Sequence, residues 1–213
     1  MRSTFFAFLL LPLSCYGHLT PYAGGCAAVL TPDPELVAQT EIAVDRWNAA
    51  TGCSLTVGQN GVIISYVESL WIDDQGNLRE AGEPQTPDRL CGIYLRSYGE
   101  ILISQWPSHV CEVRREMVLT HEIGHVIAGV GGHSESGLMA PGDTPVIDRM
   151  YIEENSLNLV CSATPCPAYN PEPVPSLSDL RRLGVKDLRY LPWSQSPPMT
   201  VLPPLAVTLP DGE

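Results

Sequence analysis

The chain has 213 residues, of which 44% are hydrophobic and 17% charged, so a folded domain is expected and wholesale disorder is excluded. With 12 basic and 24 acidic residues its net charge is −12, which argues against binding to nucleic acid or to an anionic membrane surface. Beyond the N-terminus, no apolar segment approaches the roughly 18 residues that a membrane-spanning helix needs. We therefore expect neither a nucleic-acid partner nor a membrane span.

Residues 1–15 have the order of an export signal, because Arg2 precedes an apolar stretch over 5–13 and small or polar residues follow. Cleavage after Gly17 is one outcome. The other is lipidation of Cys15, because the segment resembles the lipobox of bacterial lipoproteins, although Pro12 stands where that pattern prefers Leu. In both cases the protein is exported, to the extracellular space, the periplasm or the cell surface.

The cysteines support export. Without Cys15, an even number remains, which in an exported chain indicates three disulfides. These six are Cys26, Cys53, Cys91, Cys111, Cys161 and Cys166. The closest candidates are Cys161 and Cys166, and the other pairings stay open. A metal bound by cysteines is only weakly indicated, since the chain contains no C-x-x-C pair.

The first element in chain order is a predicted helix. Its start is expected at Thr31-Pro-Asp-Pro-Glu35, its apolar residues recur at helical spacing, and Gly52 should end it after Ala50. Two strands over 55–57 and 61–67 follow, separated by the turn residues Gln59-Asn60-Gly61.

Residues 72–88 predict a long polar loop. Asp73, Asp74 and Asn77 in this loop could bind Ca²⁺. A plain hairpin tip is the favoured interpretation, because acidic turns are common and a full calcium-loop pattern is missing.

Two further strands are predicted over 91–96 and 100–105, and a long helix from near residue 108 to 130. The helix has one apolar stripe formed by Leu119, Ile123, Val126, Ile127 and Val130. Residues 141–175 are rich in proline and predicted to be irregular. A last helix is expected over 178–191, followed by an extended Pro-rich tail over 192–213.

Residues 121–133 carry the chemistry. They read HEIGHVIAGVGGH and contain three of the 5 histidines of the chain. His121 and His125 lie one helical turn apart and project to the same side, which makes half of a zinc site. His133 is the best candidate for a third ligand, because the glycines before it let the chain turn back.

Peptide hydrolysis explains this combination of residues. Zinc lowers the pKa of a bound water to about 7 and polarises a carbonyl, provided that one coordination position stays open. Glu122, next to His121, can act as the general base that takes the proton from the water and passes it to the leaving amine.

The stretch His133-Ser-Glu-Ser-Gly-Leu-Met139-Ala-Pro141, together with H-E-x-x-H, resembles the matrixins of the metzincin clan of zinc endopeptidases. The resemblance implies zinc ligands at His121, His125 and His133, Glu122 as general base, and Met139 in a methionine turn below the metal. It also implies an α+β fold. A twisted mixed sheet with two long helices would form an upper subdomain, and a small irregular lower subdomain would end in a C-terminal helix.

The resemblance further implies one catalytic domain over 16–191 and a peptide or protein substrate lying along the strand at 91–96. The spacing departs from the family pattern H-E-x-x-H-x-x-G-x-x-H. Ala128 stands at the glycine position and Gly131 at the third-ligand position, so the nearest matches are Gly129 and His133. The oligomeric state is not indicated.

Three alternatives remain open. Glu153 or Glu154 could supply the third ligand, as in thermolysin-like enzymes. The chain could be a non-catalytic binding protein on a zinc-containing scaffold, or a surface lipoprotein with a structural metal. Tyr151 could stabilise an oxyanion, but a packed tyrosine is the favoured interpretation.

Overall fold

The computed structural model describes residues 25–80, 82, 90–105, 115–129, 132–141 and 150–174. Several predictions lie outside these residues and are not tested. They concern the export signal over 1–15 with Cys15, the cysteine at 111, the helix over 178–191 and the tail over 192–213.

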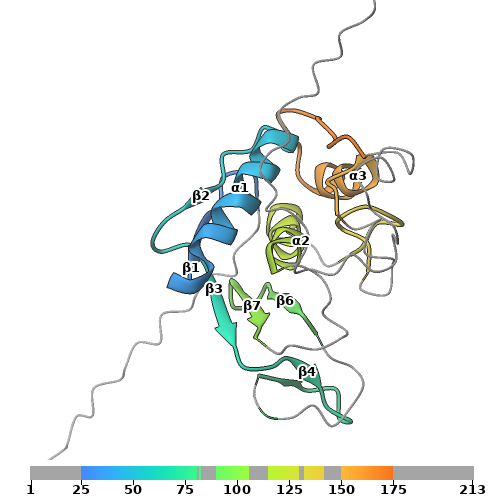
Figure 1. The fold of residues 1–213 in the computed structure, drawn as a ribbon. Helices are drawn as coiled ribbons and strands as arrows, with labels where there is room; N and C mark the ends of the chain where they lie inside the picture. The colour runs from blue at the N-terminus through green and yellow to red at the C-terminus, as the bar shows by residue number, and fades with distance from the viewer. Residues whose placement is uncertain are drawn as a thin grey trace, which may run out of the picture.

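Five strands form one mixed sheet in the order β2-β1-β3-β7-β6 (Figure 1). Strands β2, β1, β3 and β7 pair in parallel, and β6 pairs antiparallel with β7 at the edge. The strands are β1 (Val29–Pro32), β2 (Thr56–Val57), β3 (Val62–Val67), β6 (Gly92–Leu95) and β7 (Glu100–Ser104). A separate antiparallel pair consists of β4 (Trp71–Ile72) and β5 (Leu78–Arg79).

The described residues form three α-helices. They are α1 (Val37–Thr51), preceded by the short 3-10 helix η1 (Pro34–Leu36), α2 (Arg115–Ala128) and α3 (Glu154–Ala163). Helix α2 contacts both other helices and also β6 and β7. The mixed sheet and the helices agree with the predicted α+β class.

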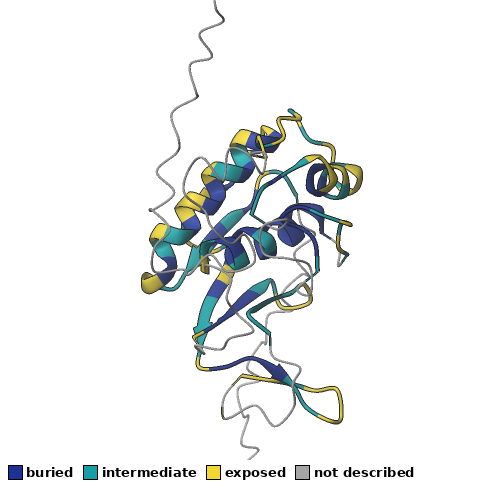
Figure 2. Ribbon diagram, turned by 45° about the vertical axis from the view of Figure 1, so that its right-hand side comes forward, coloured by how far each residue is buried: buried dark blue, intermediate teal, exposed yellow. Residues whose placement is uncertain are grey.

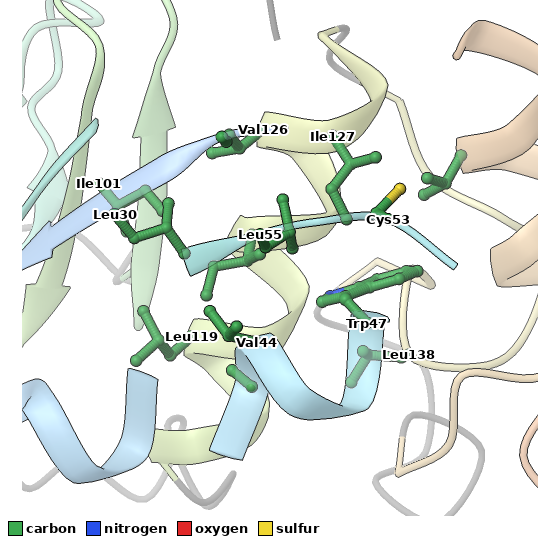
Figure 3. Packing of buried hydrophobic residues seen from close by; sticks show 14 of the residues in the cluster. Leu30, Val44, Trp47, Cys53, Leu55, Ile101, Leu119, Val126, Ile127 and Leu138 are labelled. Atoms are coloured by element: carbon green, nitrogen blue, oxygen red, sulfur yellow. The ribbon is translucent and has the colours of Figure 1, made fainter. Parts of the chain in front are cut away.

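The core lies between α1, α2 and the sheet. Trp47 of α1, Leu119 and Ile127 of α2, and Leu30 and Ile101 of the sheet are fully buried and converge there (Figure 3). Each such side chain contributes about 2 kcal/mol through burial. Exposed residues follow the outer side of α1, whereas α2 is buried along most of its length (Figure 2). The apolar stripe predicted for α2 is thus buried over its described residues.

The predicted start of the first helix is confirmed within two residues, because η1 begins at Pro34 with Asp33 at its N-cap position and Glu35 in its first turn. Thr31 belongs to β1, where its hydroxyl accepts a hydrogen bond from the Gly61 N–H at 3.0 Å. Asp33 occupies the N-cap position of η1, but its carboxylate accepts the Tyr66 N–H at 2.7 Å instead of a backbone N–H of the helix. Thr31 and Pro32 lie before the helix because they pair with β3, so the helix starts at the second proline of the predicted segment. The predicted end is confirmed, since Gly52 follows α1 with a φ of 70°.

The four predicted strands are confirmed as β2, β3, β6 and β7 within one or two residues. The predicted loop over 72–88 contains β5, which pairs with β4 around the tip at 73–77. Here the Asp73 carboxylate accepts the Asn77 N–H at 2.8 Å and the Arg79 Nε–H at 2.9 Å. These contacts are those of a hairpin tip, which was the favoured interpretation. Arg79 binds the Asp73 carboxylate that was considered as a Ca²⁺ ligand.

The prediction that residues 141–175 are irregular was wrong for α3. This helix contains Asn, Ser and Cys, which are weak helix formers, so its propensity is low. Burial stabilises it instead, because Leu157 and Val160 are fully buried against the rest of the core.

Two disulfides are described, Cys26–Cys53 and Cys161–Cys166, and Cys91 is also disulfide-bonded. The predicted pairing of Cys161 with Cys166 is confirmed. Disulfides of this kind fit an exported protein. Among the described helices, none combines the length and the apolar character needed to cross a membrane.

Candidate metal centre

Helix α2 brings His121 and His125 together on one side, as their spacing predicts. Their Nε2 atoms are 3.1 Å apart, and the ring centroids are separated by 4.8 Å. Two nitrogens bound to one tetrahedral zinc ion at 2.0–2.1 Å would lie about 3.3 Å apart. The helix therefore holds both imidazoles at the separation that a shared cation requires.

The backbone fixes the tautomer of His121. Its Nδ1 lies 2.7 Å from the carbonyl oxygen of Leu138, and a carbonyl can only accept a hydrogen bond, so Nδ1 carries the proton. In the neutral ring, Nε2 then keeps its lone pair and can bind a metal. A ligand histidine held through its second nitrogen in this way is typical of metal sites in proteins.

His133 completes the group. Helix α2 ends at Gly129, which has a φ of 64° and donates its N–H to the His125 carbonyl at 2.9 Å. The His133 ring lies 5.2 Å from that of His121 and 5.3 Å from that of His125 between centroids. Ligand atoms of the three histidines all lie within 4.8 Å of one another. The longer spacing in the sequence thus still brings His133 to the other two.

The donor set suits a particular class of ion. Three imidazole nitrogens favour zinc and related transition metals over Ca²⁺ or Mg²⁺, which prefer oxygen ligands. His125 is buried, His121 is half-buried and His133 is exposed, so the group extends from the interior to the surface. The three histidines could hold a metal ion at this boundary.

Met139 packs directly against α2 at Gly124, the residue before His125. It is fully buried in a turn closed by the Ala140 N–H, which donates to the Gly137 carbonyl at 3.0 Å. A Cβ atom at Gly124 would lie only 2.3 Å from the Met139 sulfur and 2.7 Å from the Trp47 ring. Glycine at position 124 therefore permits the turn to pack beneath the site.

Glu122 is buried between α2 and the edge strand β6, with 6% of its surface exposed. Burial raises the pKa of Glu122 to about 8, although a hydrogen bond from the Tyr94 N–H acts in the opposite direction. Strand β6 can approach this closely because Gly92 has no side chain, and its Cβ would lie 3.2 Å from the Glu122 Cγ. A cation bound beside Glu122 would favour the carboxylate form again.

Comparison of the chain with protein-family models gives no match, and comparison with curated proteins also gives none.

The alternative ligands lie elsewhere. Within the described residues, the group that could hold a metal contains neither Glu153 nor Glu154. Glu153 instead accepts a hydrogen bond from the Ser136 hydroxyl at 2.6 Å. Tyr151 is half-buried, burial raises its pKa, and its carbonyl accepts the Leu138 N–H at 2.8 Å. Its role in the described structure is packing and backbone pairing.

Sequence reasoning missed the groups that support His121 and Glu122. These are the Leu138 carbonyl, the Tyr94 N–H and the side-chain-free position at Gly92. The first two are backbone atoms that every residue has, so no pattern in the sequence could have distinguished them. Gly92 follows a cysteine at the start of a strand, and this position alone does not reveal a close contact with a helix.

Proposed function

We propose that the protein is an exported zinc-dependent endopeptidase of metzincin type. The observation that carries this proposal is the convergence of His121, His125 and His133, with Glu122 on the same helical turn as the first ligand. The Leu138 carbonyl that holds His121, and Met139 packed below, support it further.

In this proposal the three histidines hold Zn²⁺ through their imidazole nitrogens. The bound ion supplies Lewis acidity, which polarises the peptide carbonyl and acidifies the attacking water. Glu122 takes a proton from that water at its carboxylate and delivers it to the nitrogen of the leaving amine. Burial of Glu122 against β6 keeps this carboxylate out of bulk solvent and within one turn of the ligands.

The substrate is proposed to be a peptide or protein segment in extended conformation. Strand β6 lies at the edge of the sheet and contacts α2, so a peptide that pairs with this edge would lie beside Glu122. Backbone hydrogen bonds to an edge strand give affinity with little dependence on sequence, and side-chain contacts then give the preference.

The test combines metal analysis with cleavage of a mixed peptide library by the mature protein, with and without a chelator. We expect bound zinc and cleavage that the chelator abolishes and added zinc restores. Glu122→Gln should bind zinc as the parent does and lose activity by about 100-fold or more. Glu135→Gln is the matched control, because Glu135 is an exposed carboxylate close to His133 in sequence and should leave activity unchanged.

The second candidate is a non-catalytic protein that keeps the metal site as a binding scaffold. It is favoured by the burial of Glu122, whose carboxylate already accepts the Tyr94 N–H. Zinc binding without any cleavage of the library would select this candidate. Activity of Glu122→Gln equal to that of the parent would disprove the proposed role of Glu122.

A further inference from the structure

Helix α3 packs against the turn that contains Met139, although no residue of this helix belongs to the histidine group. Ser156 of α3 is fully buried, and its Oγ accepts the Met139 N–H at 3.0 Å. A buried hydroxyl aimed at a backbone amide fixes that amide, because an unpaired buried N–H would be costly.

The amide that Ser156 holds belongs to the same peptide group as the carbonyl that holds His121. The Leu138 carbonyl and the Met139 N–H are the two polar ends of one planar unit, and they point in opposite directions. His121 Nδ1 donates to the carbonyl end at 2.7 Å, and Ser156 accepts from the amide end at 3.0 Å. Rotation of this peptide plane would break both hydrogen bonds at once.

The approach of α3 to this peptide depends on Gly137. A Cβ atom there would lie 2.4 Å from the Glu153 Cγ and 2.6 Å from the Ser156 Oγ. The φ of Gly137 is 76°, in the region that favours glycine. Glycine at position 137 therefore provides both the space and the backbone conformation that allow this loop to pack against the N-terminal end of α3.

We propose that Ser156 is a positioning residue for the metal ligand His121, acting through the Leu138–Met139 peptide plane. By fixing this plane, Ser156 holds the His121 ring with Nδ1 protonated and Nε2 directed to the metal. The inference rests on the metal site of the proposed function, but it does not require peptidase activity.

The test measures zinc affinity by competition with a chelator in Ser156→Ala and in a control on the same helix, Ser162→Ala. Ser162 is exposed, and its hydroxyl donates to the Leu159 carbonyl of its own helix. Loss of a residue behind a ligand histidine costs about 10- to 100-fold in metal affinity. We expect Ser156→Ala to bind zinc about tenfold more weakly, and Ser162→Ala to bind as the parent does.

A second readout separates positioning from general loosening of the fold. In the metal-free protein, the Nδ1 proton of His121 should exchange with solvent faster in Ser156→Ala than in Ser162→Ala, as followed by NMR. Ser156→Cys leaves no cavity but offers a weaker acceptor, so its affinity should lie between those of the parent and Ser156→Ala. If Ser156→Ala does not fold, the zinc affinity of Ser156→Cys relative to the parent tests the inference.

Parent-like zinc affinity in both Ser156 variants would overturn the inference, as would weaker affinity with unchanged exchange of the His121 proton. A parent that binds zinc but cleaves no peptide would end the peptidase proposal and leave this inference standing. A parent that binds no zinc would overturn both.

Discussion

The two halves of the candidate metal centre are held in different ways. The helix half consists of His121 and His125, which lie four residues apart on α2, so the geometry of one helical turn brings their nitrogens to 3.1 Å. The loop half consists of residues 132–141 with His133. It is held by contacts to α3 and to the residue before it, such as the hydrogen bond of Met139 to Ser156 and that of Ser136 to Glu153.

The helix half is positioned by contacts local in sequence, and the loop half by contacts between distant segments. The helix half needs only that its segment be helical, and helicity follows from the buried apolar stripe of α2. The loop half needs a second element, distant in sequence, at the right place. The helix half should therefore be preorganised before a metal binds, and the loop half should respond to any change in the packing of α3.

The largest expected effect is the loss of a ligand from each half. His125 is buried beside His121, whereas His133 is exposed, where water can take a vacated position. We expect His125→Ala to weaken zinc binding by about 1000-fold, or roughly 4 kcal/mol, and His133→Ala by about 100-fold. Chelator competition measures both. An equal loss in the two variants would show that the helix half is not preorganised.

The next effect concerns an ion pair that ties α1 to the segments on either side of α3. Arg46 donates to both oxygens of Glu172, at 2.8 and 2.6 Å, and also to the Met150 carbonyl. Its side chain is 9% exposed and that of Glu172 is 23% exposed. Breaking a buried pair costs about 3–5 kcal/mol, and the partial exposure of Glu172 lowers our expectation for Arg46→Met to about 2–3 kcal/mol.

Urea unfolding of the metal-free protein measures this cost. The matched control is Arg79→Met, which breaks the ion pair with Asp73, where the arginine side chain is 51% exposed and a loss below about 1 kcal/mol is expected. Arg46→Met should also weaken zinc binding, because the loop half depends on the placement of α3. Unchanged zinc affinity in a clearly destabilised Arg46→Met would contradict that dependence.

The limits of sequence-based prediction follow the same division. Helix α2 and the four confirmed strands are encoded in local patterns, and so is the pairing of His121 with His125. The hydrogen bond of Asp33 and the stability of α3 are decided by partners far away in the chain, such as the Tyr66 N–H for Asp33. His133 was proposed as a ligand from its type and position, but the contacts of the following turn with α3 could not be predicted.

A third prediction concerns the point where the two halves touch. Replacing glycine by alanine inside a helix normally stabilises it by about 1 kcal/mol. At Gly124 the added Cβ would meet the Met139 sulfur at 2.3 Å and Trp47 at 2.7 Å. Overpacking costs about 1–3 kcal/mol, so Gly124→Ala should destabilise the protein by about 1–2 kcal/mol in urea unfolding. A stabilised variant would mean that Met139 does not pack against α2 as described.

The smallest expected effect lies in the hairpin of β4 and β5, which like the helix half is held by contacts local in sequence. Hydrogen bonds from the Asn77 backbone N–H, the Asn77 side chain, Arg79 and the Gln75 N–H lower the pKa of Asp73 to about 2. The fold therefore favours the carboxylate. Its stabilising contribution is present above the unfolded pKa of about 4 and is lost as the pH falls towards 2.

Asp73→Asn isolates this contribution from those of the other carboxylates. The parent should be the more stable protein above about pH 4, and the difference in unfolding free energy should shrink towards zero as the pH approaches 2. Zinc affinity at neutral pH should be the same in both, because β4 and β5 do not pack extensively against α2 or α3. A difference in unfolding free energy that stays constant with pH would mean that the ionised form of Asp73 does not stabilise the hairpin tip. Contacts local in sequence would then position the helix half of the metal centre but not this hairpin.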